Sequence, residues 1–221
     1  MTGGVVELAG PAGAGKTTVA TALTRTVPGT RLGPTPSRFA TLRSLVPSAP
    51  VLLGSRSVVA PARWWSEAEL RSVGYLLAWQ RLLAAPDPGR LLLLDHGPVF
   101  RLAMLVAGRP AALRHPVFGP WWRRTAAAWA GLLDAVVVLD APTEELISRI
   151  ESRPREHRVR GAERSDAERF VEDYRVAFAE VLRCLSDLGT PVVRVDTAAP
   201  PDDVADAVRS RLLASPARGP R

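Results

Sequence analysis

One stretch near the start of the chain limits its fold more than any other part. Residues Gly10 to Thr17 read Gly-Pro-Ala-Gly-Ala-Gly-Lys-Thr, which fits the spacing G-x-x-x-x-G-K-T. A mostly apolar run, Val5 to Ala9, precedes this stretch, and a helical pattern follows it. A strand, a glycine-rich turn and a helix in this order predict a loop whose backbone N–H groups bind phosphate. We therefore expect an α/β fold built around a nucleotide-binding loop.

The motif predicts separate roles for its last residues. Lys16 is expected to reach the β- and γ-phosphates of ATP, and the hydroxyl of Thr17 to bind Mg²⁺. Among the 29 lysines and arginines of the chain, Lys16 is the only lysine, so a compact ammonium is kept at this one position. The predicted nucleotide-binding residues here are Gly10, Pro11, Ala12, Gly13, Ala14, Gly15, Lys16, Thr17 and Thr18.

Short apolar runs alternate with longer helical patterns along the rest of the chain, which is typical of a parallel sheet with helices on both faces. Strands are predicted at Val5 to Ala9, Arg90 to Leu94, Ala135 to Leu139 and Val192 to Val195, with a weaker short strand at Thr30 to Leu32. Helices are predicted from Gly15 to Val27, near Phe39 to Leu45, and over Ala62 to Ala85, Val99 to Ala107, Trp121 to Leu133, Thr143 to Ser152, Asp166 to Leu188 and Asp202 to Leu213. Thr143 is the expected N-cap of its helix.

Two aspartates follow buried strands, where open α/β sheets place their ligands. Asp95 follows Leu91 to Leu94, and Asp140 follows Val136 to Leu139. A carboxylate in this place can hold Mg²⁺ or accept a proton from an attacking hydroxyl, and both aspartates are candidates on position alone. His96, which comes after Asp95, is a weaker candidate.

The motif, its flanking strand and Asp95-His96 resemble the nucleotide and nucleoside kinase branch of P-loop proteins, which contains the thymidylate-kinase-like and adenylate-kinase-like enzymes. The resemblance implies a three-layer P-loop kinase fold with a five-stranded parallel sheet in the order 2-3-1-4-5. It also implies that the strand ending at Asp95 neighbours the strand before the loop, which favours Asp95 over Asp140. Thymidylate kinases proper differ from this chain in the loop and in the residue after the aspartate, so thymidylate is not implied.

An arginine-rich stretch, residues 149–165, begins with Arg149-Ile-Glu-Ser-Arg153. Arg149 and Arg153 are four residues apart and share one helix face. The pattern resembles the approach to the lid of adenylate-kinase-like enzymes, which implies that Arg149 lies against adenine and that Arg153 reaches the transferred phosphate. Lys16, Asp95 and Arg153 are thus the expected catalytic residues, and Thr17 and Asp95 the expected metal-binding pair. Asp196-Thr197-Ala198 resembles the loop beside adenine.

Residues 28–85, together with Phe100 to Trp122, are expected to bind the acceptor. No aspartate or glutamate lies between Glu7 and Glu67, while six arginines do: Arg25, Arg31, Arg38, Arg43, Arg56 and Arg63. This composition favours an anionic acceptor, which needs positioning more than a base. Asp95, Glu67 or Glu69 could still serve as a base for a hydroxyl. Core packing explains most tryptophans, and some are candidates for an aromatic acceptor pocket.

The expected function is ATP-dependent transfer of a phosphoryl group to a small acceptor, first of all a nucleotide or nucleoside. Two alternatives stay open: a kinase of an antibiotic or other metabolite hydroxyl, and a regulatory ATPase without a small acceptor. No Asn-Lys-x-Asp motif for guanine occurs.

Residues 1–214 are expected to form a single domain, followed by a disordered tail, 215–221. The net charge of +7 is dispersed, so no nucleic-acid polymer is an expected partner. No apolar run approaches the roughly 18 residues of a membrane span, and the lone Cys184 suits a reducing compartment. A cytoplasmic protein is expected, with assembly into a homodimer left open.

Overall fold

Five parallel strands form the centre of the molecule in the computed structural model, which describes residues 4–55, 65–84, 89–152 and 161–214. The strands are β1 (Gly4–Ala9), β2 (Thr30–Leu32), β3 (Leu91–Asp95), β4 (Ala135–Asp140) and β5 (Val192–Asp196). Their order in the sheet is β2-β3-β1-β4-β5, and every neighbouring pair is parallel. The expected order 2-3-1-4-5 is confirmed, as is the short strand at Thr30 to Leu32.

The register of the strands gathers the predicted site at one edge of the sheet. Leu8 of β1 pairs with Asp95 of β3, and Ala9 pairs with Val138 of β4. The loop after β1 and the last residue of β3 therefore leave the sheet side by side, at the carboxyl ends of the strands.

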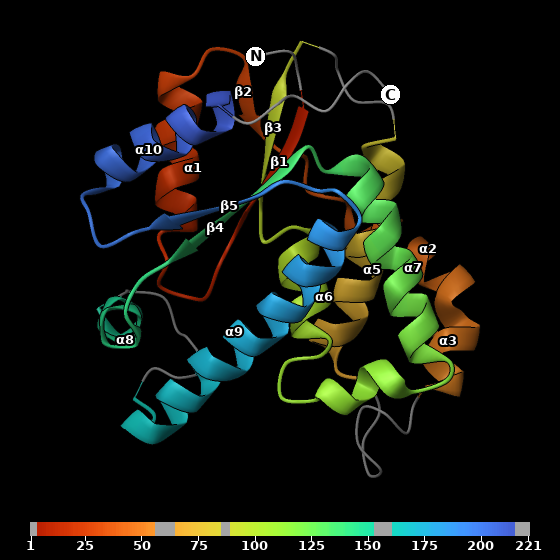
Figure 1. Cartoon of the computed structure of the whole chain (residues 1–221). Helices are drawn as coiled ribbons and strands as arrows, with labels where there is room; N and C mark the ends of the chain where they lie inside the picture. Colours follow the sequence, from red (N-terminus) through yellow and green to blue (C-terminus); the bar gives the residue numbers. More distant parts are fainter. Residues whose placement is uncertain (1–3, 56–64, 85–88, 153–160, 215–221) are drawn as a thin grey trace.

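Helices cover both faces of the sheet (Figure 1). On one face lie α1 (Lys16–Thr26), α8 (Thr143–Glu151) and α10 (Pro201–Ala214), and on the other lie α5 (Glu67–Leu82), α6 (Pro98–Met104) and α7 (Phe118–Leu132). The long helix α9 (Arg164–Asp187) runs between the two sides. Val171 packs in the hydrophobic core on the side of α1, and Leu182 packs in the core on the side of α6 and α7. The three-layer arrangement is the one expected of strands that are apolar on both faces.

Alternate residues of each strand point to opposite faces of the sheet and pack into the two hydrophobic cores there. Val6 and Leu8 pack towards α1, whereas Val5 and Ala9 pack towards α6 and α7. This alternation explains why β4 is apolar up to its last residue and β1 is apolar apart from Glu7, since both faces of each strand are covered by helices.

A proline-containing segment between β2 and α5 is more helical than its sequence suggests. It holds α2 (Arg38–Leu45), a 3₁₀ turn (Val46–Ser48) and α3 (Ala49–Gly54), of which only the first was expected. Pro47 and Pro50 each lie in a first turn, where a missing N–H costs nothing, so they begin these helices instead of interrupting them. A further 3₁₀ turn, Pro110–Arg114, precedes α7.

One expected helix start and one expected N-cap are wrong. Within the described residues the helix predicted over Ala62 to Ala85 begins at Glu67. Ser66 is its N-cap in a capping box: the Ser66 side chain accepts from the Glu69 backbone N–H, and the Glu69 carboxylate accepts from the Ser66 backbone N–H. Thr143 is not the N-cap of α8: Pro142 occupies that position, and no side chain caps the helix. The Thr143 hydroxyl instead accepts a 2.6 Å hydrogen bond from Arg175 Nη1.

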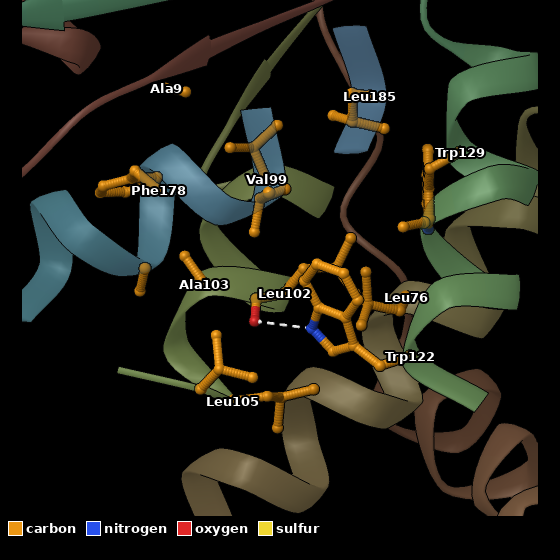
Figure 2. Close-up of a cluster of buried hydrophobic side chains, with 14 of the residues drawn as sticks. Ala9, Leu76, Val99, Leu102, Ala103, Leu105, Trp122, Trp129, Phe178 and Leu185 are labelled. Carbon is orange, nitrogen blue, oxygen red and sulfur yellow. Dashed lines mark hydrogen bonds between the residues drawn. The ribbon is translucent and has the colours of Figure 1, made fainter. Parts of the chain in front are cut away.

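The tryptophans of the described part of the chain belong to the core. Figure 2 shows Trp122 and Trp129 of α7 among Leu76, Leu102 and Leu185, with the Trp122 indole donating to the Leu102 carbonyl oxygen at 3.2 Å. Trp65, Trp79 and Trp121 are also buried. Adjacent Trp121 and Trp122 are both buried because several helices, α3, α5, α6 and α9, pack against α7. These tryptophans thus agree with the core-packing expectation. Trp121 also lines a hollow of about 430 Å³ with Leu77 and Gln80, so an aromatic acceptor pocket stays a prediction.

Parts of the predicted lid and tail lie outside the described residues. Arg153 and its neighbours to Arg160 are among them, as is the whole tail 215–221. Within the described segments, no helix has the length and apolar character that a membrane span requires.

Candidate active site

Glycines shape the loop that follows β1. Gly10 has φ 143° and Gly13 has φ 89°, a region that other residues rarely adopt. A Cβ on Gly10 would lie 2.0 Å from the Leu139 carbonyl oxygen, and one on Gly13 would lie 2.6 Å from that of Leu146. The loop can therefore lie close against β4 and α8 only with glycine at these positions.

Lys16 begins α1 and is buried inside the loop, with 6% of its surface exposed. Its Nζ donates to the carbonyl oxygens of Gly10 and Pro11, each at 2.8 Å. The ammonium is thus held over the loop by neutral oxygens. A phosphate oxygen would be a stronger acceptor for it than a carbonyl, because a hydrogen bond between two ionised groups is the stronger one.

Thr17 and Asp95 meet across the site. Thr17 Oγ1 donates to Asp95 Oδ2 at 2.6 Å, although the two residues are 78 positions apart. On the other side of the carboxylate, His96 Nδ1 lies 3.0 Å from Asp95 Oδ1. The structure thus brings together Lys16, Thr17 and Asp95, as the sequence predicted.

The surroundings of Asp95 keep its carboxyl ionised. Burial alone would raise its pKa, but the contact with His96, the hydrogen bond from Thr17 and the charge of Lys16 together lower the pKa below the ordinary value. A carboxylate with a lowered pKa is a weak proton acceptor and a good ligand for a hard cation.

Asp140, the other candidate at a strand end, has a different environment. Arg175 of α9 holds it with two hydrogen bonds, from Nε at 3.2 Å and from Nη2 at 3.1 Å. The same guanidinium donates to the Ala141 carbonyl oxygen at 2.7 Å, so it ties β4 and the start of α8 to α9. Of the two aspartates, Asp95 is the one that contacts the phosphate loop.

A carboxyl group that sequence reasoning missed lies beneath the turn after β3. Glu7 of β1 is fully buried and accepts hydrogen bonds from the backbone N–H of Val99 at 2.8 Å and of Phe100 at 3.1 Å. Burial raises the pKa of Glu7 to about 8, even though the two backbone hydrogen bonds act in the opposite direction. Glu7 thereby fixes the start of α6 relative to the strand that carries the phosphate loop.

Phenylalanine and tyrosine, not tryptophan, form the apolar wall of the site. A cavity of about 150 Å³ opens above Lys16 and Thr17 and is otherwise lined by Ala12, His96, Phe100, Phe170 and Tyr174. The rings contact one another: His96 meets Phe100 edge-on at 4.8 Å between centroids, and Phe170 lies 4.8 Å from Tyr174. A flat apolar ligand next to the phosphate loop would lie against these rings.

Arg149 lies on the opposite side of the loop. Its Nη2 donates to the Thr197 carbonyl oxygen at 2.6 Å, and its Nη1 lies 3.2 Å from Thr197 Oγ1 and 3.4 Å from the Gly13 carbonyl oxygen. Glu145, one turn earlier in α8, pairs with the same guanidinium. The structure therefore brings together the two segments that the sequence linked to adenine, Arg149 and the loop at Thr197.

Thr18 lies beside this region, on the exposed side of α1. With Thr17, Thr21 and Arg25 it lines a groove of about 400 Å³ between α1 and the start of α10, to which Asp202 contributes. The remaining predicted loop residues, Pro11, Ala12, Ala14 and Gly15, form the turn itself between β1 and α1.

Glu67 and Glu69, which the sequence left open as bases for a hydroxyl acceptor, have other partners. Glu67 pairs with Arg71 on the surface of α5. Glu69 is buried, belongs to the capping box with Ser66 and pairs with Arg109. Neither glutamate lines the cavity above Lys16 and Thr17, whereas Asp95 contacts Thr17 at its edge.

The oxygen atoms of Thr17 and Asp95 fit a shared Mg²⁺. Both are hard ligands, and they lie 2.6 Å apart at the end of the phosphate loop. Elsewhere in the described segments no cluster of three or more His, Cys, Asp or Glu could hold a metal ion. A cation at Thr17 and Asp95 would thus need phosphate oxygens and water to complete its shell, which is how Mg²⁺ is commonly bound with nucleotides.

Comparison with known proteins gives the fold. No protein-family model matches the chain, and no curated protein sequence matches it. Among solved structures, it is similar to deoxyadenosine kinase from M. mycoides with bound dATP, with a TM-score of 0.59, 15% sequence identity and coverage of 95% of this chain and 99% of that one. It is also similar to thymidylate kinase from Candida albicans, with a TM-score of 0.59, 16% identity and coverage of 96% and 92%. The chain thus has the fold of P-loop nucleoside and nucleotide kinases along nearly its whole length.

Proposed function

We propose that this protein is an ATP-dependent kinase that transfers the γ-phosphate to a small acceptor of the nucleotide or nucleoside type. The observation that carries the proposal is the 2.6 Å hydrogen bond from Thr17 to Asp95, beside the cavity that Lys16 and Thr17 line. The similar structures are kinases of such acceptors, and the deoxyadenosine kinase was solved with dATP and with dCTP bound.

In this proposal the phosphate loop holds ATP. The backbone N–H groups from Gly13 to Thr17 surround the β-phosphate, and Lys16 leaves the carbonyl oxygens of the loop to bridge the β- and γ-phosphates. Arg149 and the Thr197 loop flank the adenine. Mg²⁺, held by Thr17 and Asp95, neutralises phosphate charge when it is bound.

Asp95 acts as a metal-binding residue and not as the base. Its lowered pKa keeps it ionised and makes it a poor proton acceptor. The acceptor lies against the rings of Phe100 and Tyr174, with its reacting oxygen towards Lys16. Arg153 is proposed from the sequence to pair with the transferred phosphate.

The experiment is to incubate the protein with ATP, Mg²⁺ and a panel of nucleosides, nucleotides and metabolite alcohols, measuring ADP and phosphorylated product separately. We expect product in an amount equal to the ADP released, and neither from Lys16→Ala. Product from a metabolite alcohol alone would point to the hydroxyl kinase. ADP without product would point to an ATPase and contradict the proposal.

A further inference from the structure

An arginine without a carboxylate partner lies next to the aromatic wall of the cavity. Arg101 of α6 is partly buried, and its guanidinium carbon lies 4.7 Å from the centroid of the Tyr75 ring and 5.5 Å from that of Phe100. Its Nε is enclosed by protein and has no hydrogen-bond partner. Its Nη1 donates one long hydrogen bond, 3.4 Å, to Ser72 Oγ.

The charge of Arg101 is not neutralised by the protein around it. In the described part of the chain no carboxylate forms an ion pair with this guanidinium. Glu7 exerts some attraction, but both of its oxygens accept backbone hydrogen bonds, and with a pKa of about 8 it is mostly protonated at pH 7. Burial lowers the pKa of Arg101, and the positive charge of Arg71 lowers it further.

A partly buried cation of this kind is costly unless something pairs with it. The two aromatic faces compensate part of that cost through cation–π attraction, but among the N–H groups of the guanidinium Nε has no hydrogen-bond partner and Nη1 makes only the long bond to Ser72. An anion is the partner that a desolvated guanidinium binds most strongly, with two parallel hydrogen bonds.

The location of Arg101 connects it to the acceptor. Phe100, the neighbouring residue, lines the cavity above Lys16, and its ring stacks at 6.2 Å between centroids on Tyr174 of α9, which lines the same cavity. Arg38 and Arg43 of α2 are exposed, and neither they nor their neighbours in sequence line this cavity.

We propose that Arg101 pairs with an anionic group of the acceptor and makes the site select nucleoside monophosphates over nucleosides. This inference rests on the proposed kinase function and names the acceptor class. It agrees with the lack of a free carboxylate base, since a phosphate acceptor already presents an oxyanion.

The test measures the affinity of 5′-monophosphates and of the matching nucleosides by calorimetry, in the presence of a non-hydrolysable ATP analogue. Wild type, Arg101→Met, Arg101→Lys and the control Arg124→Met, an exposed arginine of α7, are compared. We expect at least one monophosphate to bind the wild type roughly tenfold or more tightly than its nucleoside, because a hydrogen-bonded charge pair is worth about that factor. Arg101→Met should remove most of this ratio, Arg101→Lys should keep part of it, and Arg124→Met should keep all of it.

Each other outcome overturns the inference. A wild type that binds nucleosides as tightly as monophosphates, or that binds neither, contradicts it, and so does an Arg101→Met variant that keeps the wild-type ratio. If Arg101→Met fails to fold, as judged by circular dichroism, Arg101→Lys takes its place. A wild-type ratio of monophosphate to nucleoside affinity in Arg101→Lys then contradicts the inference. Binding of the ATP analogue, measured on the same samples, separates the two proposals: its absence in the wild type refutes the kinase, whereas its presence with no preference for monophosphates refutes the role of Arg101 alone.

Discussion

The hydroxyl of Thr17 donates a 2.6 Å hydrogen bond to the carboxylate of Asp95. This contact joins the start of α1 to the end of β3 and depends on the register that pairs Leu8 with Asp95. Two elements that are far apart in the sequence are thereby combined into one oxygen pair beside Lys16. The predictions below test the roles proposed for this pair and for its surroundings.

Asp95→Asn should weaken Mg²⁺ binding while keeping the fold. Asparagine has the same shape and can still accept the hydrogen bond from Thr17, but it lacks the charge that binds the cation. We expect the Mg²⁺ concentration for half-maximal turnover to rise roughly 10- to 100-fold, as for other losses around metal sites. Titration of turnover with Mg²⁺ measures this. An unchanged midpoint would remove Asp95 from the metal site.

Glu7 should make stability fall as the pH rises. Its pKa is about 8 in the fold against an ordinary 4.5, so between these values the unfolded chain binds fewer protons. The stabilising effect of the protonated group is full below pH 4.5 and is lost as the pH rises to 8. The difference between the two pKa values, at ~1.36 kcal/mol per unit, corresponds to about 5 kcal/mol.

Glu7→Gln provides the comparison, because glutamine cannot ionise. The free energy of unfolding of both proteins is measured in urea at pH 5 and at pH 8.5. We expect the advantage of the wild type over Glu7→Gln to shrink or reverse at the higher pH. Parallel changes in the two proteins would show that Glu7 does not titrate in this range.

Arg149→Lys should weaken ATP binding even though the positive charge stays. Lysine cannot reach Thr197 and Gly13 with one planar group as the guanidinium does. We expect the Kd for ATP to rise roughly tenfold, the value of one charged hydrogen bond. Arg183→Lys, on the surface of α9, is the matched control. Equal Kd values in the variant and the wild type would contradict a role for Arg149 at the adenine.

Trp122→Ala should destabilise the fold without touching the acceptor site. The indole is almost fully buried and donates to Leu102 in the core that Figure 2 shows. We expect the free energy of unfolding in urea to fall by roughly 3–5 kcal/mol, as for other large-to-small core changes. Acceptor KM at a temperature where the variant is folded should match the wild type, and a large rise in KM would instead return this tryptophan to the acceptor site.

Much of the fold follows from local patterns. The apolar strands and the glycine-rich loop predict the sheet. Position at a strand end identifies both Asp95 and Asp140 as candidates, and the resemblance to P-loop kinases favours Asp95. Glu7 was missed because a single acidic residue in an apolar strand gives no indication of its partner, the start of α6, 92 positions away. The ion pair between Arg175 and Asp140 could not be predicted from the sequence either, because Arg175 lies within a long helix with many charged residues.

The acceptor region is the least predictable part. The sequence predicts only one helix between residues 33 and 55, near Phe39 to Leu45, whereas Pro47 and Pro50 each lie in the first turn of a further helix. The tryptophans suggested a ligand pocket by their chemistry, whereas packing between layers places those of the described residues in the core. Phe100 falls at the start of the expected acceptor range Phe100 to Trp122, but Tyr174 carries no such signal, because only the tertiary fold brings α6 and α9 to the same cavity.

The most direct test of the kinase proposal follows the γ-phosphate itself. The protein is incubated with Mg²⁺, ATP labelled at the γ-phosphate and a panel of nucleosides and nucleoside monophosphates, and the label is traced by chromatography. The account predicts label on one class of acceptor with the wild type and none with Lys16→Ala. Label released only as inorganic phosphate, or equal transfer by Lys16→Ala, would contradict it.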